Sequence, residues 1–223
     1  MTSSNEKQLP ACLSLQRLSL SSKNRPNQSG ATGSELFGVP GGASTSYPDY
    51  FKPQEHDMWC WVAVTSSLRN YYYPEENGKW TQEAIVCHMF NLPQGTCSVP
   101  NYARNKNICN KSGSARDALI ALSMYVRGAI GSGMPSIRSL ENELILNCPF
   151  VVYLVPKKPR PNGHFVVISA IANAAANAMW FVCDPWTVAT QWVSVNNFPT
   201  QYKDDRGVKW QSTYYTSKLG FNR

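Results

Sequence analysis

The chain changes character at Pro149. Before it, apolar residues recur at the three- and four-residue spacing of amphipathic helices. Helices followed by strands, without a regular alternation of the two, are typical of α+β domains. The sequence therefore predicts an α+β fold with a helical front half and a sheet in the back half. The predicted strands are rich in β-branched and aromatic residues and cover 150–155, 164–171, 179–185, 188–195 and 208–216.

The helices are predicted from two signals: a residue that can cap the N-terminus, and apolar side chains that recur on one face. The first runs from Cys60 to Tyr72, with apolar side chains at helical spacing. The second follows Thr81, whose hydroxyl can cap it, and its inner face is predicted to carry Ile85, His88 or Met89. The other predictions are helices over 114–126 and 136–146, each opening on a serine, an irregular stretch over 92–113, and a short helix over 194–202.

Residues 1–47 are rich in serine, glycine and proline and poor in apolar side chains. Burying so little apolar area cannot offset the entropy lost on ordering the segment. We therefore predict a flexible tail over 1–47 and a folded domain over 48–223. The first 30 residues show no standard secretory signal peptide, and no run approaches the roughly 20 apolar residues that span a bilayer.

The charge and the cysteines narrow the possible partners. The net charge of +7 is spread thinly, and the longest basic cluster, at 156–161, holds three cations broken by prolines. This falls short of a nucleic-acid-binding tract. The seven cysteines are an odd set, so at least one is unpaired within the chain, and they form no metal-binding cluster with histidine. The composition argues against both nucleic acid and metal.

Cys60 lies at the predicted N-terminus of the first helix. The positive end of the helix dipole favours the thiolate over the thiol there, which makes the sulfur a better nucleophile. The alternative is a buried structural cysteine. We favour the nucleophile because the chain also holds residues that can complete a catalytic set.

A thiol nucleophile needs a general base, and the chain offers three histidines, at 56, 88 and 164. His164 is the best candidate, because Gly163 leaves room in front of it and an apolar strand behind it would fix the imidazole at the edge of the sheet. His88 lies inside a predicted helix and is interpreted as a core or groove histidine. His56, four residues before Cys60, is interpreted as lining the cleft.

Asp184 ends the strand that follows the strand of His164. If the two strands pair in antiparallel fashion, the carboxylate reaches the second ring nitrogen and orients the imidazole. The alternative is that Asp184 only starts a turn before Pro185.

Gln54 lies six residues before Cys60. Its side-chain amide, together with the backbone amide of Cys60, can stabilise the oxyanion of an acyl-transfer intermediate. A surface glutamine before a turn is the alternative. Three tryptophans, at 59, 61 and 186, either wall the cleft or belong to the core.

Together these residues resemble the papain-like cysteine proteases, in which a glutamine precedes by six positions a Cys-Trp pair that opens a long helix. Gln54, Cys60 and Trp61 have that spacing. The segment GHFVVI followed by DP is similar to the compact bacterial branch, akin to bacteriocin-leader peptidases and plant-pathogen effector proteases. The resemblance spans about residues 50–217. It implies a papain-like α+β fold, in which a helical N-terminal lobe with the nucleophile helix packs against an antiparallel β-sheet lobe.

By this resemblance Cys60 is the nucleophile, His164 the general base and acid, Asp184 the orienting carboxylate and Gln54 the oxyanion donor. The expected activity is hydrolysis of peptide bonds in a protein or peptide substrate, without a cofactor. Two alternatives stay open: a deamidase or transglutaminase that uses the same scaffold, and an inactive binding module.

The polar, acid-poor start is what we expect of a bacterial effector or toxin that is secreted without a standard signal peptide and acts on a host-cell protein. The other expectation is a cytoplasmic location. The segment GVPGGA at 38–43 is a hypothetical self-processing site. Cys97 and Cys109 either stay thiols or form a bridge that closes a loop of about 13 residues and stabilises the fold by on the order of 3 kcal/mol.

Overall fold

The computed structural model describes residues 42–130, 133–157, 163–172, 177–186, 190–200 and 207–218. Its helices are α1 Cys60–Tyr72, α2 Gln82–Met89, α3 Val99–Cys109, α4 Ala115–Ala121 and α5 Ile137–Ile145, with short 3-10 turns at Tyr47–Tyr50 and Pro74–Glu76. Its strands are β1 Ala43–Ser44, β2 Tyr125–Ile130, β3 Phe150–Pro156, β4 His164–Ala172, β5 Met179–Cys183, β6 Thr190–Ser194 and β7 Val208–Thr216. No helix in these ranges is long and apolar enough to cross a membrane.

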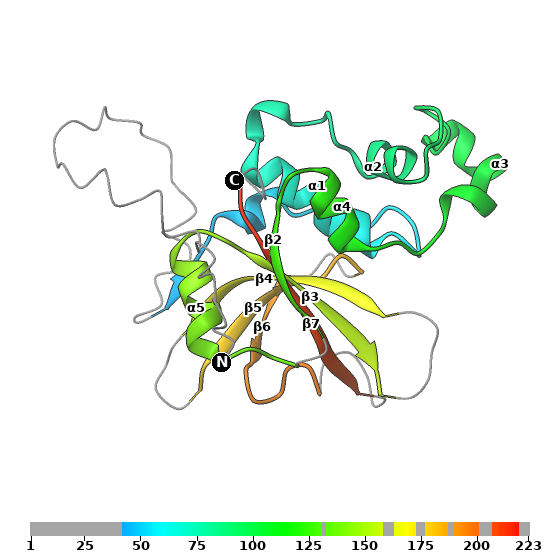
Figure 1. The fold of residues 1–223 in the computed structure, drawn as a ribbon. Helices are drawn as coiled ribbons and strands as arrows, with labels where there is room; N and C mark the ends of the chain where they lie inside the picture. Colours follow the sequence, from blue (N-terminus) through cyan, green and yellow to red (C-terminus); the bar gives the residue numbers. More distant parts are fainter. Residues whose placement is uncertain are drawn as a thin grey trace, which may run out of the picture.

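The strands in the described ranges form one seven-stranded sheet in the order β2-β7-β3-β4-β5-β6, and β1 pairs with β4 off this path. All the pairings are antiparallel. Helices α1 to α4 lie together beyond one side of the sheet, and α5 lies apart from them (Figure 1). The predicted α+β architecture, a helical lobe against an antiparallel sheet lobe, is confirmed.

The central strands are buried on both faces. Val151 and Val167 join the core that contains α1, whereas Val152 and Val166 join a second core with Leu144 of α5. Successive side chains of a strand point to opposite faces, so each strand supplies both cores. This double burial explains why β3 and β4 read as continuous apolar runs instead of alternating ones.

Helix α1 is the predicted nucleophile helix, and its predicted bounds are confirmed. Ten of its 13 residues are buried. The buried hydroxyls keep their hydrogen bonds, since Thr65 Oγ1 donates to the Trp61 carbonyl and Ser66 Oγ to the Trp80 carbonyl, both at 2.7 Å. Cys60, its first residue, is partly exposed. The core therefore fixes the helix while its N-terminus reaches solvent.

The predicted caps of the other helices are confirmed. Thr81 Oγ1 accepts a hydrogen bond from the Ala84 amide at 3.1 Å, at the start of α2. Ser114 and Ser136 cap α4 and α5 in the same way. In each case the capping hydroxyl and the amide that donates to it are only three residues apart in the chain. Such a cap is a local feature, so these helix starts could be predicted from the sequence.

Helix α3 lies in the stretch that we predicted to be irregular. Cys109 is the single buried residue among its 11. A helix that buries so little shows no apolar stripe, so periodicity could not reveal it. Its first residues are Val99 and a proline, and a turn of backbone hydrogen bonds at Gly95 and Ser98 leads into it.

The predicted helix over 114–126 is wrong at its end. Helix α4 stops at Ala121, because Ser123 adopts the left-handed conformation with φ of 56°. Strand β2 then begins at Tyr125, opposite Thr216 of β7. Tertiary pairing with β7 thus overrides the helical spacing of this segment. The helix predicted over 194–202 is also wrong where it is described, since residues 195–200 form turns.

The folded domain begins earlier than the predicted boundary at residue 48. Ala43 pairs with Ile171 of β4 and is buried, and the Tyr47 side chain is fully buried. The assignment of residues 42–47 to the tail is therefore corrected. A two-residue strand is too short to show a periodic pattern, which is why the sequence hid it. The prediction of a flexible tail otherwise falls on residues 1–41, outside the described residues.

Gly42 offers a test of this boundary. A Cβ atom at this position would overlap the carbonyl oxygen of Ile171. We expect Gly42→Ala to lower the free energy of unfolding by about 1–3 kcal/mol, as overpacking typically does. Urea denaturation of the full chain measures it. Ser46→Ala, at an exposed neighbouring position, is the control and should stay within about 0.5 kcal/mol. Equal midpoints for Gly42→Ala and the wild type would mean that β1 adds nothing to the stability of the domain.

Candidate active site

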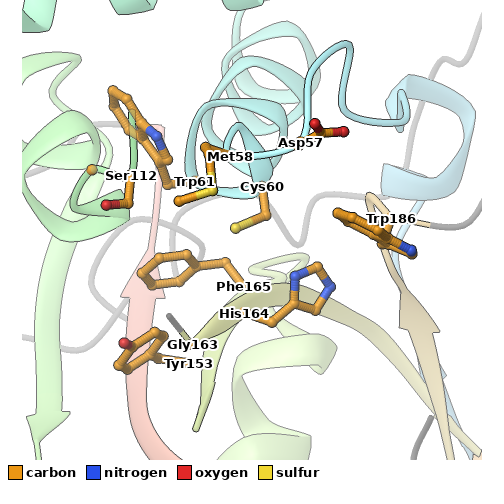
Figure 2. Close-up of a pocket in the computed structure, with 11 residues that line it drawn as sticks. Asp57, Met58, Cys60, Trp61, Ser112, Tyr153, Gly163, His164, Phe165 and Trp186 are labelled. Atoms are coloured by element: carbon orange, nitrogen blue, oxygen red, sulfur yellow. The ribbon is translucent and has the colours of Figure 1, made fainter. Parts of the chain in front are cut away.

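A cavity of about 570 Å³ opens where the N-terminus of α1 faces the start of β4. Cys60 enters it from α1 and His164 from β4, on opposite sides (Figure 2). The other residues that line it are Asp57, Met58, Trp61, Ser112, Gly113, Tyr153, Gly163, Phe165 and Trp186.

His164 and Asp184 meet as predicted from the strands that carry them. Strands β4 and β5 are antiparallel, with Val167 opposite Cys183, so both residues come to the same end of the sheet. His164 Nε2 lies 2.7 Å from Asp184 Oδ1. Asp184 is fully buried, and its Oδ1 also accepts a hydrogen bond from the Trp186 amide at 2.8 Å. The carboxylate is therefore held in place and orients the imidazole.

Cys60 and His164 line the same cavity and face each other across it, and Cys60 is among the groups that raise the pKa of His164 (Figure 2). Cys60 is partly exposed, whereas the other free cysteines of the described residues, at 87, 148 and 183, are buried. Among the thiols in the described part of the chain, only that of Cys60 thus combines access to solvent with a histidine partner.

The charge on His164 is stabilised by its two partners. Burial lowers the pKa of His164, but hydrogen bonds to Asp184 and Cys60, and the negative charges of these groups, outweigh it and raise the pKa to about 9. The imidazole is therefore protonated at neutral pH. A protonated imidazole beside a sulfur and a buried carboxylate is suited to general acid catalysis of acyl transfer.

Gln54 lies in the loop before α1 but is not among the residues that line the cavity. Its backbone amide donates to the Pro185 carbonyl at 2.8 Å, which ties the loop before α1 to the loop after β5. Its Nε2 donates to the carbonyls of His56 and Asp57, at 2.8 and 2.9 Å. Gln54 does not line the cavity, and both of its amide protons are engaged. Its role as an oxyanion donor stays a prediction that requires one of these bonds to open.

The other two histidines lie outside the cavity lining. His88 is exposed on α2, with its ring 5.5 Å from that of Trp80, so the interpretation as a core or groove histidine is wrong. The buried face of α2 instead carries Ile85, one turn before His88. His56 stacks on Tyr102 at 3.4 Å, and burial lowers its pKa.

The three tryptophans at 59, 61 and 186 were predicted either to wall the cleft or to belong to the core, and the structure shows both cases. Trp59 is fully buried and belongs to the core. Trp186 is 58% exposed and lines the cavity. Trp61 does both, since it is buried and presents part of its ring to the cavity.

Several lining residues were missed by the sequence analysis. Tyr153 and Phe165 pair across β3 and β4, and their rings stack with centroids 4.6 Å apart. Phe165 could have been suspected from its position next to His164. Ser112 and Gly113 follow α3 and carried no recognisable signal, because only the tertiary fold brings them to Cys60.

Of the two alternatives left open for Cys97 and Cys109, the structure shows the disulfide bridge. In the described ranges no group of three His, Cys, Asp or Glu side chains is placed to hold a metal ion.

Comparison with known families assigns residues 47–215 to the Peptidase_C39 like family. No curated protein matches the sequence closely. The matched span contains α1, the whole cavity and the residues Cys60, His164 and Asp184. It also covers well over half of the 223 residues. The chain therefore belongs to the Peptidase_C39-like family of papain-like cysteine peptidases, as the resemblance read from its sequence predicted.

Proposed function

We propose that this cysteine peptidase hydrolyses peptide bonds with Cys60 as nucleophile, His164 as general acid and base, and Asp184 as the orienting carboxylate. The observation that carries the proposal is the arrangement at the cavity, where Cys60 of α1 faces His164 of β4 and His164 Nε2 lies 2.7 Å from Asp184 Oδ1.

The reaction begins with the proton of Cys60 held by His164. Cys60 Sγ attacks the carbonyl carbon of the scissile bond, and the carbonyl oxygen becomes an oxyanion. When the C–N bond breaks, His164 gives its proton to the leaving amine, and an acyl thioester remains on Cys60. Water then attacks the thioester while His164 takes up one of its protons. The thioester C–S bond breaks, the acid leaves, and the Cys60 thiolate beside the protonated His164 is restored.

The oxyanion needs donors at the start of α1. The backbone amide of Cys60 is in the first turn of the helix, where Trp59, the N-cap residue, makes no side-chain capping bond. Gln54 supplies a second donor if Nε2 releases the carbonyl of His56 or Asp57 when substrate binds.

Product analysis separates the proposal from its alternatives. Hydrolysis of a peptide gives two fragments whose masses add up to the substrate plus one water. Ammonia released without chain scission would identify a deamidase instead. An inactive binding module predicts that an epoxide inhibitor labels Cys60 no faster than the buried Cys148.

The cavity wall predicts a preference for apolar substrates. Tyr153, Phe165, Trp61 and Met58 line it together, so an apolar side chain next to the scissile bond would leave water for an aromatic surface. We expect kcat/KM to be roughly 10- to 100-fold higher for a peptide with leucine than for one with aspartate at that position.

The matched variants for this test are at Tyr153. Tyr153→Ala should reduce the preference for leucine by about tenfold, because it removes much of the apolar wall. Tyr153→Phe keeps the ring and should preserve the preference. Equal kcat/KM values for the two peptides in the wild type would contradict the proposed pocket.

We propose further that the chain is secreted and acts on a protein of a host cell. The Cys97–Cys109 bridge supports this, because disulfides persist in oxidising compartments and are reduced in most cytosols. Immunoblotting of culture medium and cell lysate tests it. Detection of the chain only in the lysate under inducing conditions would contradict secretion.

The hypothetical self-processing segment meets a geometric constraint. Ala43 pairs with Ile171, seven residues along β4 from His164. At about 3.3 Å per residue, that separation is roughly 23 Å. Cleavage next to Ala43 therefore requires β1 to leave the sheet or a second molecule to act on it. Intact masses of the wild type and Cys60→Ala, each incubated at several concentrations, test for cleavage and for its order.

A further inference from the structure

The segment 109–111, which begins at the bridged Cys109, forms hydrogen bonds with the residues on both sides of Cys60. The Cys109 carbonyl accepts a hydrogen bond from Trp59 Nε1 at 2.8 Å, and the Lys111 carbonyl accepts one from Trp61 Nε1 at 3.1 Å. The segment 109–111 thus contacts both neighbours of the nucleophile. We call this segment the clamp.

Asn110 supplies the third contact of the clamp, and it alone uses a side chain. Its Oδ1 accepts a hydrogen bond from the backbone amide of Met58 at 3.1 Å, two residues before Cys60. The other two contacts use backbone carbonyls, which a substitution does not remove. The Asn110 contact can therefore be tested by mutation.

The bridge restrains the clamp. Cys109 is the last residue of α3 and the single buried residue of that helix, so apolar burial alone fixes α3 weakly. The bond to Cys97 ties the end of α3 to the turn before it. Tyr102 of α3 also stacks on His56, in the loop that leads to Cys60.

The clamp continues into the wall of the cavity. Ser112 and Gly113 follow it and line the cavity. A Cβ atom on Gly113 would overlap the ring of Trp61. A shift of the clamp would therefore move the nucleophile loop and the substrate wall together.

We propose that Asn110 is a positioning residue for Cys60, and that the Cys97–Cys109 bridge holds it in place, so that reduction of the bridge slows the reaction of Cys60. The inference deepens the proposed function and rests on it. A dithiol reductant would supply two electrons and two protons: the S–S bond breaks, two thiols form, and the reductant becomes a cyclic disulfide. The enzyme then needs a reduced Cys60 and an oxidised bridge at the same time.

The test compares Asn110→Leu with Asn110→Asp. Leucine removes the acceptor at similar volume, whereas aspartate keeps an oxygen at the same place. We expect Asn110→Leu to lower kcat and the rate of Cys60 alkylation by iodoacetamide roughly 10- to 100-fold, because small misplacements of a nucleophile have effects of that size. KM should stay within about twofold, and Asn110→Asp should recover most of the loss. Equal losses in both variants, or none in Asn110→Leu, would overturn the proposal.

The role of the bridge is tested by replacing Cys97 and Cys109 with serine, alone and together with Asn110→Leu. If the bridge acts through the clamp, the loss in the combined variant is smaller than the product of the separate losses. Losses that multiply fully would overturn the coupling between the bridge and Asn110.

Amide hydrogen exchange of residues 56–62 measures how firmly the clamp restrains the segment around Cys60, independently of catalysis. We expect faster exchange in Asn110→Leu than in the wild type. Unchanged exchange would overturn the inference that Asn110 restrains this segment. If exchange responds but Cys60 of the wild type is alkylated no faster than Cys148, the proposed function fails and the catalytic role of Asn110 fails with it.

Discussion

Replacing Cys60 with alanine is expected to lower kcat for peptide cleavage by roughly 10⁴- to 10⁶-fold, since removal of a nucleophile eliminates the covalent route. Other thiols of the described residues cannot substitute for it, because Cys87, Cys148 and Cys183 are buried and Cys97 is bridged. The residue is partly exposed, so the loss of its sulfur should cost little stability. The measurement is the steady-state rate on a peptide substrate, with unfolding midpoints recorded in parallel.

Cys148→Ala is the matched control for this prediction. It removes a buried thiol outside the cavity, and kcat should remain within about threefold of the wild type. Residual activity of Cys60→Ala within tenfold of the wild type would exclude Cys60 as the nucleophile.

Replacing Asp184 with asparagine is expected to lower kcat roughly 10²- to 10⁴-fold and to move the alkaline limit of activity to lower pH. The pKa of His164 is raised to about 9, with Asp184 among the groups that raise it. Below that pH His164 holds the proton that the leaving amine needs, and above it the proton is lost. The wild-type kcat/KM should therefore fall as pH rises through about 9. Without the carboxylate charge, the pKa of His164 falls, so the decline should begin at lower pH.

The pH dependence of kcat/KM measured between roughly pH 5 and 10 checks this second prediction. Asp117→Asn is the control, because Asp117 is an exposed carboxylate on α4 outside the cavity. Its pH profile should superimpose on that of the wild type. An alkaline limit that stays unchanged in Asp184→Asn would show that a group other than His164 governs it.

Much of the site could be predicted because its signals are local. The start of α1 at Cys60 follows from apolar spacing over 13 residues, and it places the sulfur at the end of a buried helix. His164 and Asp184 lie at the ends of two consecutive strands with strong β patterns. Consecutive strands joined by a short turn usually pair, so their meeting required no knowledge of the rest of the chain.

Other elements could not be predicted because long-range contacts decide them. Helix α3 buries one residue and carries no apolar stripe. Strand β2 forms because β7, about ninety residues later, pairs with it. The residues around His88 predict a helix but do not indicate which of its faces is exposed. The packing of α2 against α1 decides this, and it leaves His88 exposed to solvent.

The amino-acid sequence by itself determined the α+β class, the bounds of α1, and which cysteine, histidine and aspartate come together at the cavity, since each depends on periodicity or on neighbours in the chain. The tertiary structure alone decided how Gln54 is turned, which aromatic rings wall the cavity, and which segment holds the loop before Cys60. The bond between Met58 and Asn110 joins residues 52 positions apart, and that between Trp59 and Cys109 joins residues 50 positions apart. Hydrogen bonds between residues so far apart in the chain form only when the chain folds, so they cannot be predicted from local sequence patterns.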